Sequence, residues 1–215
     1  MDIKSESDTN AQPPAYRIET SRLVLRCWQP ADAKLLQEAV SASREHLLPW
    51  MDWAHAEPES LQTRIDCLRR FRAEFDLGQD FIYAIFNRDE SKVLGGSGLH
   101  TRVGSRAREI GYWVHVDHVG KGLATEATKA LIKVAFEIDG IERIEIRCDP
   151  ENTASAAVPE KLGFHLDGIL RKSLPQLDGS LRDTMMWTLL REEYPNSLSA
   201  ELDIKAFDVI GRRLL

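Results

Sequence analysis

A strand, a glycine-rich turn and a helix follow one another without a break between Arg108 and Ile138. "REIGYWVHV" is typical of a β-strand, Gly120 and Gly122 form the turn, and a helix of about 15 residues is expected to follow. The first amides of a helix have no intrahelical partner, and the helix dipole adds partial positive charge there. The two glycines therefore predict either a phosphate site on open amides or a plain tight turn.

The segments on either side of this unit predict alternating strands and helices. Strands are expected over 22–28, 81–87, 92–100 and 143–149, followed by a hairpin over 165–190 that is closed by "LDGS". Apolar residues at helical spacing predict helices over 30–43 and 59–75, and Asn152 is expected to cap a further short helix. Since helices connect the later strands, part of the sheet must be parallel. The expected fold class is α/β (α+β), with a mixed sheet of about seven strands.

The two ends of the chain differ in composition from the domain expected over residues 16–195. Residues 1–15 are polar, end in prolines and predict a disordered leader. The last 20 residues, 196–215, predict an amphipathic helical extension on the spacing of Leu198, Leu202, Phe207, Ile210 and Leu214. This extension and the edge strands are compatible with a homodimer.

Composition excludes several classes of protein. The net charge is −6 without a dominant basic block, so nucleic acid is not an expected partner. Cys27, Cys67 and Cys148 are too widely spaced for a disulfide framework or a metal pair, and the six histidines lack metal-site spacing. We therefore expect no metal. No run reaches the roughly 20 apolar residues of a membrane helix, and no signal core opens the chain, so a cytoplasmic protein without a membrane partner is expected.

The ordered set of motifs resembles the GNAT superfamily of acyl-CoA N-acyltransferases, and within it the RimJ/RimL branch. The resemblance rests on "RLVLR", "LPWMDW", Gly95 to Leu99, "EIGYWVHV" with the glycine turn, and "NTASAAVPEKLGF", and it extends over about 16–194. It implies a GNAT fold in which the central strands splay apart. It also implies that acetyl-CoA lies in the resulting cleft as a co-substrate.

The resemblance places the cofactor on the strand end, the turn and the helix that Asn152 opens. The residues that it implies are Trp113, Val114, His115, Val116, Val119, Gly120, Lys121, Gly122, Leu123, Ala124, Thr125, Asn152, Ser155 and Lys161. Val119 departs from the family, which often has Gln or Arg there, and we expect a modest effect because amides hold the phosphates. Lys161 is equally compatible with a solvated surface residue.

Direct transfer to an amine requires a base or a water relay for the amine and a proton for the leaving thiolate. Glu109 is the expected base because the family commonly has an acidic residue before this strand segment; a solvent-facing charge is the alternative. Ser155 is expected beside the thiol, in an Asn-x-x-Ser pattern that the branch carries, and plain capping and packing are the alternative. Cys148 lacks an evident activating partner, so covalent catalysis is not expected.

The acceptor side is expected between the first two helices and at the last hairpin. Trp50 and Trp53 predict an apolar or stacking wall, with core packing as the alternative, and Asp52 is suited to attract a cationic amine. The predicted function is acetyl transfer from acetyl-CoA to a primary amine, either a protein N-terminus or a small molecule. The alternative is a non-catalytic acyl-CoA sensor.

Overall fold

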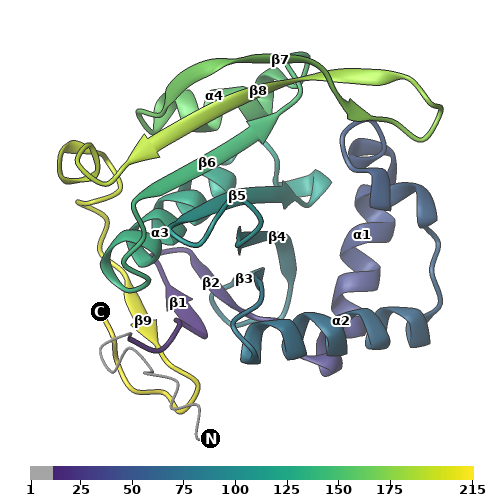
Figure 1. The fold of residues 1–215 in the computed structure, drawn as a ribbon. Coiled ribbons are helices and arrows are strands. Elements are labelled where there is room, and N and C mark those ends of the chain that lie inside the picture. The colour runs from purple at the N-terminus through teal and green to yellow at the C-terminus, as the bar shows by residue number, and fades with distance from the viewer. Residues whose placement is uncertain (1–11) are drawn as a thin grey trace, which may run out of the picture.

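The computed structural model describes residues 12–215 and contains one nine-stranded mixed sheet. The strand order is β7-β8-β6-β5-β4-β3-β2-β1-β9 (Figure 1). The strands are β1 Arg17–Glu19, β2 Leu23–Cys27, β3 Phe81–Asn87, β4 Val93–His100, β5 Ala107–Val114, β6 Arg143–Cys148, β7 His165–Pro175, β8 Leu181–Leu190 and β9 Lys205–Phe207. The α-helices are α1 Ala33–Leu47, α2 Leu61–Asp76, α3 Leu123–Glu137 and α4 Thr153–Lys161. Short 3-10 turns occur at η1 Pro30–Asp32, η2 Asp52–Ala56, η3 Val116–His118 and η4 Tyr194–Asn196.

The sheet opens between β5 and β6. These strands form the parallel pair, and their pairing covers Ala107 to Glu109 on β5 and Arg143 to Glu145 on β6. Both strands then continue, to Val114 and Cys148, without pairing to each other, and their ribbons diverge (Figure 1). The predicted splay of the central strands is confirmed, and within residues 12–215 no strand pairs with the β6 side of β5 beyond Glu109.

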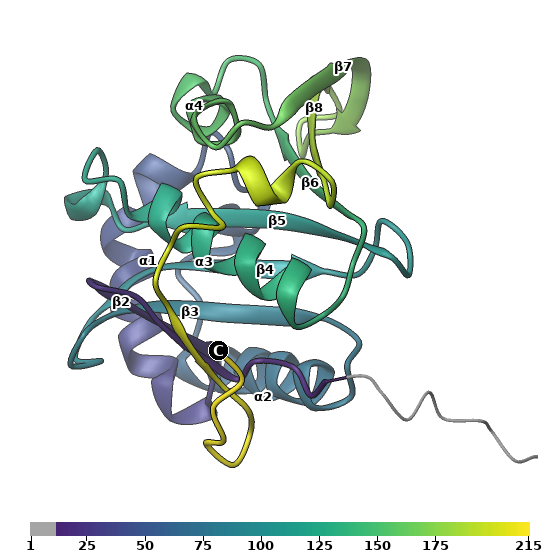
Figure 2. The same cartoon turned by 90° about the vertical axis from the view of Figure 1, so that its left-hand side faces the viewer.

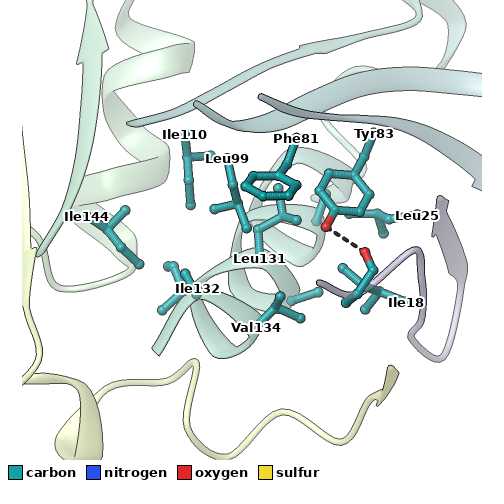
Figure 3. Close-up of a cluster of buried hydrophobic side chains, with 14 of the residues drawn as sticks. Ile18, Leu25, Phe81, Tyr83, Leu99, Ile110, Leu131, Ile132, Val134 and Ile144 are labelled. Atoms are coloured by element: carbon teal, nitrogen blue, oxygen red, sulfur yellow. Dashed lines mark hydrogen bonds between the residues drawn. The ribbon is translucent and has the colours of Figure 1, made fainter. Parts of the chain in front are cut away.

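Helices cover both faces of the sheet. α1 and α2 pack on one face around Trp28, Leu68 and Phe86, while α3 lies on the other (Figure 2). Figure 3 shows apolar side chains of α3, among them Leu131 and Ile132, against the strands. Burying an aliphatic side chain of this size contributes about 1.5–3 kcal/mol, so this core fixes α3 and the turn before it.

The predicted strands and helices between residues 22 and 190 are confirmed, with ends shifted by a few residues. Asn152 caps α4 as expected, since its Oδ1 accepts a hydrogen bond of 3.0 Å from the Ser155 N–H. The hairpin β7–β8 closes through Gln176 and Ser180, as "LDGS" predicts. No helix in residues 12–215 is long and apolar enough to cross a membrane.

The amphipathic helix predicted in residues 196–215 is wrong. The segment instead forms β9, which pairs with β1 from Arg17 to Glu19 and so satisfies the outer edge of that strand. A turn at Asp208 and Gly211 (φ +81°) follows, and Ile210, which the helical spacing would bury, is 73% exposed. Pairing between strands overrides the weak local helical pattern of this segment. The two short strands β1 and β9 raise the number of strands from the predicted seven to nine.

The predicted leader is described only at its end. Residues 1–11 lie outside the described residues. Ala15, which the prediction assigns to the leader, is fully buried, and its carbonyl accepts a hydrogen bond of 2.7 Å from the Tyr83 hydroxyl. The ordered domain therefore begins before residue 16.

Asp139, directly after α3, is expected to make stability depend on pH. Burial raises the pKa of its carboxyl from 3.8 to about 6, and Arg108 offsets this only in part. Because the folded state holds this proton more tightly, stability falls as pH rises through that window. Asp139→Asn should therefore raise the free energy of unfolding at about pH 8, by up to roughly 3 kcal/mol, and should change it little at about pH 3. Urea unfolding at both pH values tests this; equal effects at both would contradict it.

Candidate active site

One cavity connects the opening in the sheet with the glycine turn and with the end of α1. Its volume is about 500 Å³. The predicted cofactor residues that line it are Trp113, Val114, Val119, Gly120, Gly122, Leu123, Ala124, Thr125, Asn152, Ser155 and Lys161. Trp50, predicted on the acceptor side, lines the same cavity together with Met51. The structure therefore brings the two halves of the predicted site together.

The glycine turn presents a row of unpaired amides to this cavity. Gly120 (φ +71°) and Gly122 (φ +74°) adopt left-handed backbone conformations, and Gly122 caps α3 without a side-chain bond. Between residues 12 and 215, no protein atom accepts a hydrogen bond from the N–H groups of residues 119–125. The turn therefore needs its glycines for backbone geometry and also exposes amides at a helix N-terminus, where the helix dipole favours an anion. This arrangement fits a pyrophosphate.

A partly exposed ion pair outside the predicted site fixes the turn. Glu126, in the first turn of α3, accepts hydrogen bonds of 2.5 Å from Arg22 and from the Thr20 hydroxyl. Arg22 also donates to the carbonyl of Lys121 at 3.0 Å. "RLVLR" supplies this arginine, but the contact joins segments about a hundred residues apart, so the sequence alone does not reveal it.

The end of β5, where the resemblance places the cofactor, has few free backbone groups. The His115 N–H donates to Leu94 on β4 at 2.8 Å, and the Val116 N–H donates to the Ser43 hydroxyl at 3.0 Å. Because alternate residues of a strand direct their polar groups to opposite sides, the N–H and C=O of Val114 point toward the opening. Val114 is thus free to pair with an extended ligand, whereas the amides of His115 and Val116 already have partners.

Three of the predicted cofactor residues do not line the cavity: Val116, whose amide already has a partner, and the side chains of His115 and Lys121. The His115 ring accepts from the Asp117 N–H at 3.1 Å and lines a separate hollow beside Glu38 and Lys92. Lys121 donates from Nζ to the Asp117 carbonyl at 2.6 Å and does not line the cavity. A contact of either side chain with the cofactor stays a prediction.

Ser155 lies where α4 approaches β5, and its hydroxyl contacts Tyr112. The Ser155 Oγ lies 3.4 Å from the Tyr112 hydroxyl, which in turn donates to the Ser155 carbonyl at 2.9 Å. Burial raises the pKa of Tyr112, so this phenol stays protonated and acts as a donor. Both residues line the cavity. Tyr112 is a site residue that the sequence prediction missed, because its strand position carries no motif for this role.

Cys148 ends β6 in the same region. The thiol is buried, and burial raises its pKa. A nucleophilic cysteine needs a lowered pKa, so the structure gives Cys148 no activation for covalent catalysis.

Glu109 is buried at the point where the strands separate. Arg102 donates to both of its carboxylate oxygens, to Oε2 at 3.0 Å, and the Arg147 Nε lies 3.8 Å from Oε2. Its side chain does not line the cavity. The base role of Glu109 stays a prediction, and Arg102 is hydrogen-bonded to both of its carboxylate oxygens.

The predicted acceptor residues lie around η2. Trp53 is 41% exposed and packs edge-on against Trp113, with ring centroids 5.9 Å apart. Asp52 begins η2 but does not line the cavity. Trp50, Met51 and Trp113 line the apolar end of the cavity, whereas Trp53 packs on Trp113 and does not line it. The acceptor roles of Trp50, Trp53 and Asp52 stay predictions. Within residues 12–215, no group of three or more His, Cys, Asp or Glu side chains is placed to hold a metal ion.

Comparison with known proteins agrees with this geometry. Residues 22–165 match the family model described as "Acetyltransferase (GNAT) domain". The chain is 30% identical over 186 residues to the Escherichia coli enzyme named [Ribosomal protein uS5]-alanine N-acetyltransferase, an alignment that covers 84% of this chain and 94% of that relative.

Solved structures give the same result at the level of the fold. Mycobacterium smegmatis RimJ, in complex with CoA-disulfide, is 28% identical with a TM-score of 0.72, covering 88% of this chain and 91% of that one. The microcin C7 self-immunity acetyltransferase MccE, in complex with acetyl-CoA and AMP, has a TM-score of 0.73 at 22% identity, over 80% and 93% of the two chains.

Proposed function

The chain belongs to the GNAT acetyltransferase family, and we propose that its acceptor is the α-amino group at the N-terminus of a protein. The protein is an acetyl-CoA-dependent N-acetyltransferase, and the non-catalytic sensor alternative is not favoured because its relatives are named as N-acetyltransferases. The acceptor proposal is supported by the relative of 30% identity, whose named substrate is a ribosomal protein alanine.

The single structural observation that carries the proposal is the continuity of the cavity. It runs from the glycine turn, where amides are open, to Trp50 and Met51 at the end of α1. An apolar end lined by large side chains suits the first side chains of a peptide better than a small, highly charged polyamine.

In this arrangement the residues of the chain have separate tasks. The amides of residues 119–125 hold the pyrophosphate of acetyl-CoA. The backbone of Val114 orients the extended, thiol-bearing part of the same molecule in the opening between β5 and β6. Bound acetyl-CoA supplies an activated thioester. Ser155 donates a hydrogen bond to the departing thiolate, and Tyr112 fixes Ser155 through its carbonyl. Lys161 lines the α4 end of the same cavity.

An acceptor panel with free-thiol detection tests the proposal. We expect thiol release with short peptides that have a free N-terminus, at least about tenfold faster in kcat/KM than with aminoglycosides, polyamines or free amino acids, because the apolar end binds peptide side chains. The matched control is the same peptide with a blocked N-terminus, which should give only the hydrolysis background. A small-molecule amine that outperforms every peptide would contradict the acceptor proposal while leaving acetyl transfer intact.

A further inference from the structure

The indole of Trp113 forms a wall at the apolar end of the cavity. We propose that Trp113 is a specificity-determining residue, and that the position of its indole sets how large the first side chain of the acceptor peptide can be. The inference rests on the proposed function, because it concerns the peptide residue that carries the reacting amine. It gives the Trp113 side chain a task on the acceptor side, whereas the sequence prediction places this residue on the cofactor side.

The side chain of Trp113 lies on the face of β5 that α1 and α2 cover. Successive residues of a strand point to opposite faces, and Tyr112, the residue before it, contacts Ser155 of α4. The indole of Trp113 packs instead against the apolar cluster that α1 and α2 form around Trp28. It is half-buried and lines the cavity. Adjacent residues of β5 therefore offer a free backbone group, at Val114, and an apolar wall, at Trp113.

Two contacts hold the indole in place. A Cβ atom placed on Gly96, the direct partner of Trp113 in the β4–β5 register, would lie 2.6 Å from the indole Nε1 and 3.3 Å from two ring carbons. The ring therefore lies over Gly96, in a space that exists because this residue has no side chain. Trp53 of η2 also packs edge-on against the ring, with centroids 5.9 Å apart. The indole is thus supported both by β4 and by η2.

The wall lies beside the position where the two substrates must meet. Trp50, Met51 and Trp113 all line the cavity, but of these three only Trp113 comes from β5, the strand that carries the free groups of Val114. The α-amine and the first side chain of a peptide are attached to the same carbon. A peptide whose amine reaches the thioester must therefore place that side chain close to the indole.

A supported aromatic wall discriminates by size. In a hydrophobic pocket, one methylene group that is missing or does not fit changes kcat/KM by about 10- to 200-fold. A ring that was free to rotate would give way to a larger side chain, but this indole rests on Gly96 and against Trp53. The geometry therefore predicts a limit on size rather than a general preference for apolar side chains.

Trp113→Leu and Gly96→Ala should move the wall in opposite directions. Trp113→Leu removes most of the ring and enlarges the cavity. The new methyl group of Gly96→Ala would lie 2.6 Å from the indole, so the ring must shift, and because the sheet lies under the ring it can only move away from β4 and narrow the cavity. Gly96 does not have a left-handed φ, so alanine fits its backbone.

Peptides that differ only in their first residue measure the effect. Compared with the wild type, Trp113→Leu should raise the ratio of kcat/KM for a leucine-first peptide to that for an alanine-first peptide at least about tenfold, and Gly96→Ala should lower it at least about threefold. Acetyl-CoA affinity by calorimetry should stay within about threefold. Gly111→Ala is the matched control, because its Cβ lies on the same face of β5 but 3.6 Å from its nearest neighbour, the His100 ring, so the ratio should not change.

Two further measurements separate a specificity role from a structural one. Trp113→Phe keeps an aromatic ring over Gly96, so it should change the ratio in the same direction by a smaller factor, and it carries the test if Trp113→Leu does not fold. Calorimetric titration of the CoA-bound proteins with the two acetylated product peptides should show the same change in relative affinity without turnover.

Lost packing alone would lower kcat/KM for every peptide by the same factor. An unchanged ratio in the folded Trp113 and Gly96 variants would therefore overturn the role of the wall while leaving N-terminal acetylation intact. Acetylation of small-molecule amines but of no peptide by the wild type would instead overturn the proposed acceptor, and this inference with it.

Discussion

Valine in place of Gly120 should weaken acetyl-CoA binding at least about 100-fold, which isothermal titration calorimetry can measure directly. Gly120 lines the cavity, and a Cβ placed there has no protein atom within 4 Å, so the new side chain would project into open space beside the amides. A bulky group there separates the pyrophosphate from several amides at once. The left-handed φ of +71° adds strain that also tends to move the turn.

Gly78→Val separates the effect on the ligand from the effect on the backbone. Gly78 has a similar φ of +66°, and a Cβ atom placed on it would also have no protein atom within 4 Å, but it follows α2, outside the cavity. We expect comparable losses of thermal stability in the two variants and a loss of binding in Gly120→Val alone. Equal acetyl-CoA affinity in the folded Gly120→Val protein would remove the turn from the cofactor site.

Ser155→Ala should lower kcat about 100-fold with little change in acetyl-CoA affinity, because it removes the donor nearest to the predicted position of the thiolate. Ser155→Thr keeps a hydroxyl at the same position and should retain most of the activity. Tyr112→Phe should give an intermediate loss, since it removes the bond to the Ser155 carbonyl while the serine hydroxyl remains.

Steady-state kinetics with a fixed amine, together with calorimetry, separates these contributions. A loss in Ser155→Ala that appears as a change in acetyl-CoA affinity, with kcat unchanged, would assign Ser155 to binding alone. Wild-type kcat in both Ser155→Ala and Tyr112→Phe would exclude this pair from the chemical step.

Local chemistry explains why much of the cavity is predictable from the sequence. Gly120, Gly122 and Asn152 act through backbone conformation and capping, which depend on neighbouring residues, and the structure places all three as expected. Strands such as β3 and β5 are also predictable, because their own residues are typical of β-strands. The resemblance to a known family adds the splay between β5 and β6, which no local pattern encodes.

Contacts between distant segments explain what the sequence could not provide. The bond between Arg22 and Glu126 joins the start of β2 to α3, and the contact between Trp53 and Trp113 joins η2 to the end of β5. Neither has a fixed spacing that a motif could capture. The helix predicted over 196–215 is wrong for a related reason: the unpaired edge of β1 decides the conformation of β9, and that edge is almost two hundred residues away.

The most direct test of the central claim is to incubate the protein with acetyl-CoA and a peptide that has both a free N-terminus and an internal lysine. Tandem mass spectrometry then locates any acetyl group, while thiol release is followed in the same reaction. The account predicts one acetyl group on the α-nitrogen, one thiol released for each acetyl group transferred, and loss of both signals in Gly120→Val. Binding of acetyl-CoA without acetylation of this or any other amine would contradict it.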